Sequence, residues 1–304
     1  MSVCVRGAAG MAKLVLTVTQ EQSGRSVLSL LKQEFALSTS CINRLKRTKT
    51  GLTCNGQRVF TNARLQAGDV LAADPEAAER PSGIEPIPMP LSICYEDEHL
   101  LILDKSAPLA VIPSSLRPDE PTLANGLAHY LGEGFAFHPV NRLDRGTTGL
   151  MVVAKNGFIH DQLRRALHSG DFHRHYLAVC LGQPDPAEGD IDLPIGRDLT
   201  SAIRRRIDPD GQEARSHYRL LSSTAAFSLV RLTPYTGRTH QLRLHMSAIG
   251  HPLAGDWLYG TEDPSLISRP ALHAAELFLT HPVTGRPLAF TTPLPGDMTS
   301  LLEG

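Results

Sequence analysis

The segment NRLDRGTTGL, from Asn141 to Leu150, carries the side chains whose types and spacing best suggest chemistry. It places one carboxylate, Asp144, between Arg142 and Arg145. Because opposite charges nearby favour the ionised form of a carboxyl group, we expect Asp144 to be an anion. Such a group can act as a nucleophile or a general base. Taken alone, the same pattern also fits a structural ion pair on a loop.

The residues that follow predict how this carboxylate is held. Gly146 to Gly149 has the composition of a turn, and Met151 to Ala154 is an apolar run typical of a buried strand. We therefore expect Asp144 on a tight loop attached to rigid structure, where catalytic residues are often found.

Two later stretches contain further candidates. Tyr176 begins a run that predicts a strand, Tyr176 to Val179, in which an aromatic residue needs no functional reason. Farther on, Gly237 allows a sharp turn, and a helix is predicted to begin just after His240. Polar groups at a helix N-terminus form a ready anion site, so Arg238 is well placed to meet a carboxylate from another loop.

The histidines of that helix do not predict a metal site. His240 and His245 are five residues apart, whereas two ligands on one helical face are four apart, and no acidic or thiol ligand accompanies them. The five cysteines are dispersed without a Cys-x-x-Cys pair, which indicates reduced thiols. We expect no metal.

Composition indicates an ordinary soluble protein. The 304 residues are 41% hydrophobic and 20% charged, enough for two domains. No run approaches the roughly 20 apolar residues that a membrane span needs, and the start lacks a signal-peptide pattern. These features predict a cytoplasmic protein with no membrane partner. Residues 1–11 are interpreted as a disordered lead or a misassigned start.

Residues 12–74 are predicted to form a small basic domain, because residues 1–75 carry a net charge of +6. Apolar spacing predicts one helix near Val27 and a second from Ser38 to Gly51, followed by a hairpin at Asn55-Gly56. This layout resembles the RNA-binding domain named after ribosomal small-subunit protein S-four. The resemblance implies an RNA-facing edge, although a solvated basic face is the simpler alternative. The residues of this predicted RNA-facing edge are Arg44, Lys46, Arg47, Lys49 and Arg58.

A Pro- and Glu-rich linker is predicted over residues 75–92, and a second domain over residues 93–304. Leu100 to Leu103 indicates a buried strand, and Asn156 and Gly170 are the expected caps of a helix. Strands and helices do not alternate regularly, which favours an α+β fold over a doubly wound one.

The second domain resembles the RluA-type pseudouridine synthases, on four segments that occur in order. They are the Arg-Leu-Asp loop, the Tyr-x-Ala strand, GRTHQLR followed by GHPLAGDWLYG, and LHA followed by HPVTG. The resemblance implies a mixed, largely antiparallel sheet with flanking helices. The sequence departs from the family pattern at Asn141, where the family commonly has His, and at Lys105-Ser106-Ala107-Pro108.

Carried onto this sequence, the resemblance makes Asp144 the catalytic aspartate, Tyr176 the residue that stacks on the target base, and Arg238 the partner of Asp144. It implies isomerisation of uridine to pseudouridine without a cofactor, with Asp144 acting either at C1′ or on the C2′ proton. We expect a monomer that acts on structured RNA, ribosomal rather than transfer RNA. The other residues expected to bind substrate or RNA are Arg142, Arg145, His240, Gln241 and Arg243.

Two alternatives remain at this stage. A nucleoside-bond hydrolase would normally use a second carboxylate or a positioned water, and Asp144 has no such companion in the sequence. A catalytically silent RNA-binding or ribosome-assembly factor would not need Asp144, Tyr176 and Arg238 together.

Overall fold

The computed structural model describes residues 13–75, 81–132 and 134–303, so the interpretation of residues 1–11 lies outside it. The first part of the chain contains β1 (Leu14–Thr17), α1 (Val27–Gln33), α2 (Thr39–Leu45), β2 (Leu52–Cys54), β3 (Gln57–Arg58) and β4 (Val70–Ala73). The middle contains β5 (Ser92–Glu96), β6 (Leu100–Lys105), α3 (Leu123–Leu131), β7 (His138–Pro139), β8 (Thr148–Ala154), α4 (Gly157–Ser169) and β9 (Phe172–Leu181). The last part contains β10 (Glu188–Asp192), β11 (Ile195–Arg197), β12 (Arg205–Ile207), β13 (Arg215–Ser223), β14 (Phe227–Pro234), α5 (Gln241–Ala248), β15 (Leu272–Thr280), β16 (Pro287–Thr291) and α6 (Gly296–Thr299).

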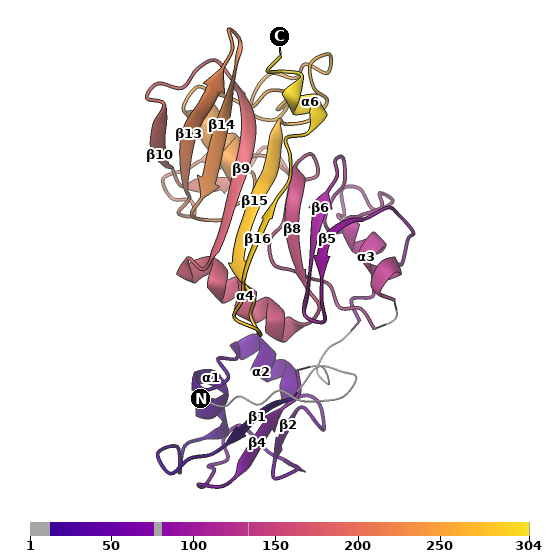
Figure 1. Cartoon of the computed structure of the whole chain (residues 1–304), viewed down its shortest axis with the longest axis vertical. Coiled ribbons are helices and arrows are strands. Elements are labelled where there is room, and N and C mark those ends of the chain that lie inside the picture. Colours follow the sequence, from indigo (N-terminus) through magenta and orange to yellow (C-terminus); the bar gives the residue numbers. More distant parts are fainter. Residues whose placement is uncertain (1–12, 76–80, 133, 304) are drawn as a thin grey trace.

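The first six elements pack around a hydrophobic core of their own, at the lower end of the molecule (Figure 1). Their sheet has the order β1-β4-β2-β3, and α1 and α2 supply buried side chains such as Leu30 and Ile42. The hairpin lies where the sequence predicts it, with Asn55 and Gly56 at φ 50° and 79°. Positive φ at both positions is what a two-residue type I′ turn requires.

Helix α2 is shorter than the sequence predicts. It begins after Ser38, whose side chain accepts from the amide of Cys41, but it ends at Leu45 rather than near Gly51. Bonds of the i→i+3 type, from the Arg47 amide to the Arg44 carbonyl at 3.0 Å, already tighten the chain there. As a result, the predicted basic residues after Leu45 lie on an irregular turn.

The rest of the chain forms a ten-stranded sheet whose path is β10-β13-β14-β9-β15-β8-β6-β5, with β16 beside β15 and β7 beside β8. All its pairs are antiparallel except β8 with β15. The predicted α+β fold with a mixed, largely antiparallel sheet is therefore confirmed. The parallel pair places the start of β8, which follows Asp144, beside the start of β15.

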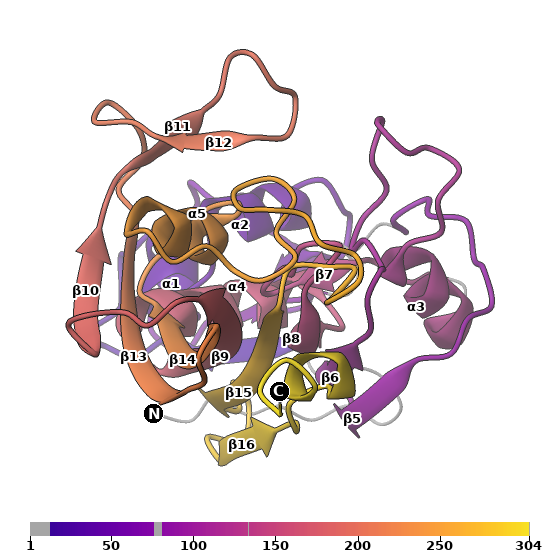
Figure 2. The ribbon, with the colours of Figure 1, turned by 90° about the horizontal axis from the view of Figure 1, so that it is seen from above.

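Helices bury alternate residues of the strands. Met151 and Val153 of β8 belong to a cluster shared with α3 and α5, whereas Val152 and Ala154 belong to one shared with α4. Helix α4 starts at its predicted cap Asn156 and ends at Gly170, which has φ 88°. Figure 2, a view along the long axis, shows α5 and the β11–β12 hairpin on the same side of the large sheet as α2.

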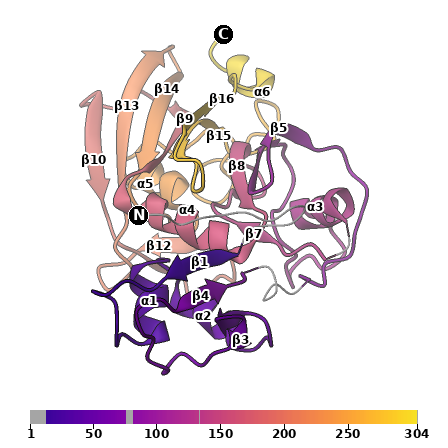
Figure 3. The same ribbon diagram turned by 60° about the horizontal axis from the view of Figure 1, so that its bottom comes forward.

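Two further contacts link the parts of the chain. Helix α4 also contacts α2, since the Ser38 hydroxyl donates to the Asp161 carboxylate and Phe158 packs against the N-terminal core (Figure 3). Residues 81–91 form no regular structure, but the Ile87 amide donates to the Asn125 carbonyl at 3.1 Å, which ties this segment to α3. None of the helices in the described ranges is long and apolar enough to cross a bilayer.

Candidate active site

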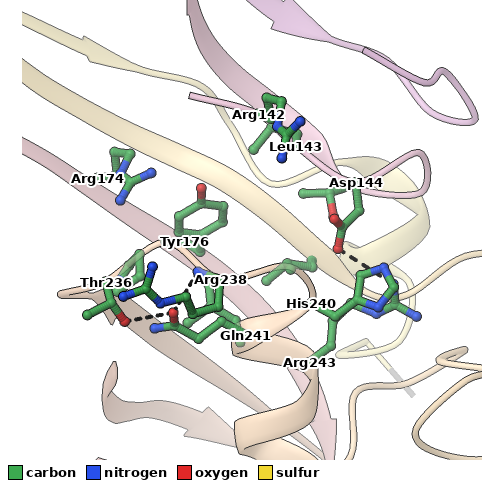
Figure 4. Close-up of a pocket in the computed structure, with 15 residues that line it drawn as sticks. Arg142, Leu143, Asp144, Arg174, Tyr176, Thr236, Arg238, His240, Gln241 and Arg243 are labelled. Atoms are coloured by element: carbon green, nitrogen blue, oxygen red, sulfur yellow. Dashed lines mark hydrogen bonds and ion pairs between the residues drawn. The ribbon is translucent and has the colours of Figure 1, made fainter. Parts of the chain in front are cut away.

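Three predicted segments meet at one pocket (Figure 4). The loop before β8 contributes Asp144, and β9 contributes Tyr176. The turn before α5 contributes Thr236, Gly237, Arg238 and His240. The fold brings them together because β8 and β9 both flank β15, and α5 packs on the same cluster as Tyr176. Residues almost 100 positions apart therefore line a single space.

Asp144 is the one carboxylate among the residues that line this pocket, and its side chain is 29% exposed. Its closest cation is Arg243, whose Nη1 lies 3.5 Å from Asp144 Oδ2. Arg243 is itself fixed, because its Nε and Nη2 donate to the two oxygens of Asp256 at 2.8 and 2.7 Å. A fork held on two sides aims its third nitrogen with little freedom.

This pairing corrects the prediction for Arg238. The Nε of Arg238 donates to the carbonyl of Glu213 at 2.8 Å, and its own amide donates to Gln241. Arg238 still lines the pocket, but its guanidinium is anchored away from Asp144. The sequence misled because Arg238 precedes the helix, whereas Arg243 lies on the helix face that turns toward the loop.

The ion pair between Arg243 and Asp256 is almost completely buried. Arg243 is 5% exposed and Asp256 is 0% exposed, yet the pKa of Arg243 is raised. Burial alone would lower that pKa, but the hydrogen bonds and charge of Asp256, together with the charge of Asp144, outweigh it. Arg243 therefore stays a cation beside Asp144 throughout the physiological range.

Tyr176 lies in the pocket wall with only 6% of its surface exposed. Burial raises the pKa of its hydroxyl, and the nearby negative charge of Asp144 acts in the same direction. The phenol therefore stays neutral, and a neutral aromatic ring beside an anion suits contact with a flat, uncharged base.

The turn before α5 is held by Gln241. Its Oε1 accepts from the Thr236 hydroxyl and the Arg238 amide, and its Nε2 donates to the Arg215 carbonyl and Ser216 hydroxyl, all at 2.8 to 2.9 Å. Gln241 is 4% exposed and Arg243 is 5% exposed, and the polar atoms of both are engaged within the protein. They support the pocket wall. The direct RNA contacts that the sequence predicts for these two side chains are therefore not supported, because their polar atoms already bind protein groups.

Tyr259 connects the pocket to the β11–β12 hairpin. Its hydroxyl oxygen accepts from the Arg205 amide at 2.8 Å and lies 3.0 Å from His240 Nδ1. The guanidinium of Arg243 stands 5.3 Å from the Tyr259 ring centre. Burial lowers the pKa of His240, which keeps its ring neutral at pH 7, so Nδ1 can accept a hydrogen bond from the Tyr259 hydroxyl. His240 itself adopts φ 58°, a left-handed conformation that is uncommon for a residue other than glycine.

Two buried basic side chains also hold the backbone of the Asp144 loop. Lys105, which is 1% exposed, donates to the carbonyls of Ser106 and Leu109 at 2.9 and 2.8 Å and lies 3.5 Å from that of Arg145. Burial lowers the pKa of Lys105 to about 7. Arg269 Nη1 donates to the Gly146 carbonyl at 3.3 Å while its other nitrogens bind Asp297. Lys105 and Arg269 therefore fix the backbone of the loop at the Arg145 and Gly146 carbonyls.

The two arginines that flank Asp144 turn away from it. Arg145 donates from its Nε to Glu120 at 2.7 Å. Arg142 is exposed at the pocket rim, and no carboxylate of the described residues lies within ion-pair distance of it. Arg142 is thus available to a phosphate, whereas Arg145 already has a partner.

The predicted basic edge of the N-terminal part is divided. Arg44 is half-buried near the α2–α4 contact, where its charge helps to lower the pKa of Asp161 against the effect of burial. The other four members are exposed: Lys46, Arg47, Lys49 and Arg58. No ion pair joins these four to a carboxylate within the described ranges, which leaves their charges directed to solvent.

The two histidines tested for a metal site are directed to different partners. His245 is fully buried, with its ring nitrogens 3.0 Å from the Ser216 hydroxyl and the Leu193 carbonyl, while His240 lies against Tyr259. In the part of the chain that the structure describes, no group of three or more His, Cys, Asp or Glu side chains is arranged to hold a metal ion.

Sequence reasoning missed several residues of the site. Asp256 and Tyr259 belong to the GDWLYG segment, which in the sequence only marks the family resemblance. The spacing of an acid and an aromatic residue after a His-Pro turn was the available signal. Arg269 and Lys105 gave no local signal, since their value depends on the tertiary contacts of the loop.

The pocket, its single carboxylate and the large mixed sheet define an enzyme of the pseudouridine synthase class. Residues 99–248 match the family model described as RNA pseudouridylate synthase. The chain is 39% identical over 274 residues to the uncharacterized RNA pseudouridine synthase YjbO of Bacillus subtilis, covering 89% of this chain and 96% of that protein. The chain therefore belongs to the RNA pseudouridine synthase family and is an isomerase that acts on RNA.

Two other relatives agree with this assignment. Ribosomal large subunit pseudouridine synthase D of Escherichia coli K12 is 34% identical over 315 residues, which cover 96% of this chain and 94% of that protein. Among solved structures, human RNA pseudouridylate synthase domain containing 1 is similar with a TM-score of 0.55 and 28% identity, covering 67% of this chain and 83% of that one.

Proposed function

We propose that Asp144 carries out the isomerisation of uridine in RNA, supported by Arg243 and Tyr176. The reaction breaks the bond between C1′ and N1, turns the uracil and forms a bond between C1′ and C5. The C5 proton leaves and N1 takes up a proton, so uridine and product are isomers. Asp144 either attacks C1′ or takes the C2′ proton, and both routes start from its ionised form. Arg243 places a guanidinium nitrogen 3.5 Å from Asp144 Oδ2, which holds the carboxylate at the wall of the pocket.

The observation that carries the proposal is the convergence of Asp144, Arg243 and Tyr176 on one pocket. Tyr176 offers a neutral ring on which a flipped uracil can stack. Flipping a base out of its stack costs a few kcal/mol, which phosphate contacts at the rim, such as one from Arg142, can offset.

The test is the release of the C5 hydrogen from RNA labelled at that position, with wild-type enzyme and with Asp144→Asn. We expect release from the wild type only, together with pseudouridine in the product. Appearance of free uracil would identify a hydrolase instead. RNA binding without either product would identify a silent RNA-binding factor.

We propose ribosomal RNA as the substrate and residues 12–74 as an S-four-type RNA-binding domain, linked by residues 75–92 to a catalytic domain over residues 93–304. The name of the Escherichia coli relative, a large-subunit ribosomal pseudouridine synthase, supports the substrate. The four exposed cations of the N-terminal part support the second role.

Charge reversal tests the N-terminal role. Changing Lys46, Arg47, Lys49 and Arg58 to Glu should weaken binding to ribosomal RNA fragments and flatten its dependence on salt, because fewer counterions are released. Unchanged binding would remove these residues from the RNA contact. The substrate is tested by mapping pseudouridines in ribosomal RNA from cells that lack the protein and from the same cells supplied with the wild type or with Asp144→Asn. A ribosomal site that only the wild type restores would support the proposal, and an unchanged map would contradict it.

We also propose that the enzyme works as a monomer in the compartment where ribosomes assemble. The support is that residues of a single chain complete the pocket. Light scattering of the purified protein at working concentration should give a mass near 33.0 kDa, and a doubled mass would contradict the proposal.

A further inference from the structure

Phe60 is an unusually exposed aromatic residue in the N-terminal part of the chain. Its side chain is 68% exposed, more than that of any other aromatic residue among the exposed large hydrophobic side chains. Leaving a phenyl ring in water forfeits the free energy that its burial would contribute. An exposed aromatic residue on an otherwise well-packed unit therefore suggests a surface contact.

The backbone on both sides of Phe60 is fixed. The Val59 amide donates to the Leu52 carbonyl at 3.1 Å, and the Ala63 amide donates to the Phe60 carbonyl at 3.0 Å. Val59 packs against the N-terminal core, whereas the side chain of the next residue, Phe60, lies on the surface. Phe60 is thus held outward by the fold.

A cation stands beside the ring. The guanidinium of Arg58 lies 5.6 Å from the centre of the Phe60 ring, within the range of a cation–π contact. Arg58 Nη2 also donates to the Lys46 carbonyl at 3.2 Å, which fixes the guanidinium between the ring and the end of α2. The ring and the guanidinium form a small preorganised platform.

The surroundings of this platform are positively charged. Lys46, Arg47 and Lys49 occupy the turn that follows α2, and all three are exposed. In the described ranges no carboxylate pairs with them or with Arg58, so the patch presents uncompensated positive charge around an aromatic face. Phosphates bind such cations, and nucleotide bases stack on aromatic rings and on arginine planes.

We propose that Phe60 and Arg58 bind an unpaired nucleotide of the RNA substrate, with the base stacked on the Phe60 ring and the neighbouring phosphates on Lys46, Arg47 and Lys49. This inference deepens the proposed RNA-binding role of the N-terminal part and rests on it. It adds a stated preference, for single-stranded over duplex RNA. A duplex has its bases stacked internally and offers only phosphates to this surface.

The experiment measures fluorescence anisotropy of the full-length protein with a labelled single-stranded oligonucleotide and with its duplex, in an Asp144→Asn background that prevents turnover. Phe60→Ala should weaken single-strand binding by about 5- to 150-fold, the loss of one stacked base, and change duplex binding little. Phe60→Trp should bind single strands at least as tightly as the wild type. The slope of log affinity against log salt should stay the same in Phe60→Ala and decrease in Arg58→Gln, which loses a charge.

Tyr130→Ala is the matched control. Tyr130 is an aromatic residue of α3 that is 51% exposed, but its hydroxyl donates to the carboxylate of Glu96 rather than lying beside a cation. The Tyr130→Ala variant should bind RNA as tightly as the wild type does. Thermal unfolding of each variant verifies that the fold is retained.

Equal single-strand binding by Phe60→Ala and the wild type would overturn the inference, and so would an equal loss on single strands and duplex. Failure of the proposed function looks different. If the wild type bound RNA through Phe60 but released no C5 hydrogen from ribosomal RNA, the nucleotide site would stand and the proposed activity would fall.

Discussion

Arg243 reaches Asp144 with the one nitrogen that Asp256 leaves open. Its Nη1 lies 3.5 Å from Asp144 Oδ2, while Nε and Nη2 are bound to Asp256 at 2.8 and 2.7 Å. The longer of these contacts faces the pocket, and the shorter ones face the interior. Asp256 therefore fixes the direction of Arg243, and Arg243 fixes the electrostatic surroundings of Asp144.

Replacing the two candidate arginines separately tests this assignment. Arg243→Gln removes a charge-assisted contact to the catalytic carboxylate, so kcat should fall by about 10- to 150-fold. Arg238→Gln leaves Asp144 and its contact intact and should mainly raise KM, because Arg238 lines the pocket without touching Asp144. Steady-state kinetics on one RNA substrate measures both. A larger loss of kcat in Arg238→Gln than in Arg243→Gln would indicate that Arg238 is the functional partner of Asp144.

The buried pair should also matter for stability. Asp256→Asn leaves Arg243 as a buried cation with a weakened partner, and breaking such a pair typically costs about 3–5 kcal/mol of unfolding free energy. Urea denaturation followed by circular dichroism measures the change. Asp208→Asn, which weakens the ion pair with the exposed Arg206, is the control and should leave the midpoint nearly unchanged. Equal midpoints for both variants would contradict the buried-pair argument.

Tyr259 should couple the β11–β12 hairpin to the pocket. Tyr259→Phe keeps the ring beside Arg243 but removes the hydroxyl that meets His240 and the Arg205 amide. We expect kcat/KM to fall by about 2- to 12-fold, the contribution of one hydrogen bond, and the hairpin to be cleaved faster by protease. Tyr259→Leu loses the ring face as well and should reduce kcat further.

The control for this prediction is Tyr130→Phe. Its hydroxyl also donates to a protein group, the Glu96 carboxylate, but neither residue lines the pocket. It should keep wild-type kinetics and wild-type protease sensitivity. If Tyr259→Phe matched it in both measurements, the hydroxyl would have no part in positioning His240 or the hairpin.

Gly149 marks where the Asp144 loop joins the sheet. It has φ 109°, and an added Cβ would lie 2.3 Å from the Ala274 carbonyl oxygen of the neighbouring strand β15. Gly149→Ala should therefore destabilise the protein by about 2 kcal/mol or more and separate β8 from β15. Gly237→Ala, where an added Cβ meets nothing within 4 Å, is a control for substitution at the pocket. Comparable denaturation midpoints would show that β8 can shift to accept the methyl group.

The sequence predicted local features well. Asn156 and Gly170 delimit α4, Asn55-Gly56 forms the hairpin, and Tyr176 lies on a strand beside the pocket, because each depends on side chains within a few residues. The sequence misplaces the end of α2 because Gly51 is a typical helix terminator, whereas i→i+3 bonds end the helix six residues earlier, at Leu45.

The partner of Asp144 could not be found in the same way. Arg238 and Arg243 occur in one short motif, and both are arginines beside a helix start. Which of them meets Asp144 depends on the rotation of α5 against β13 and β14 and on the buried position of Asp256, which follows the helix. These are tertiary facts, and no spacing within the motif encodes them.

Lys105 gives a prediction for stability against pH. In the unfolded chain a lysine has a pKa of about 10.4, whereas burial lowers the pKa of Lys105 in the folded protein to about 7. Between these values the unfolded chain holds a proton that the folded protein has released. The unfolding free energy from this group should therefore rise with pH from about 7 to about 10, by about 1.4 kcal/mol per pH unit.

Lys105→Met provides the comparison, because it keeps an unbranched buried side chain and removes the titrating amine. Urea denaturation of both proteins at intervals from pH 7 to pH 10 gives two stability curves. Every other titrating group contributes equally to each, so their difference isolates Lys105. The wild-type curve should climb relative to that of the variant. Parallel curves would mean that Lys105 keeps its proton in the fold, held as a cation by the Ser106, Leu109 and Arg145 carbonyls and by the charge of Asp144.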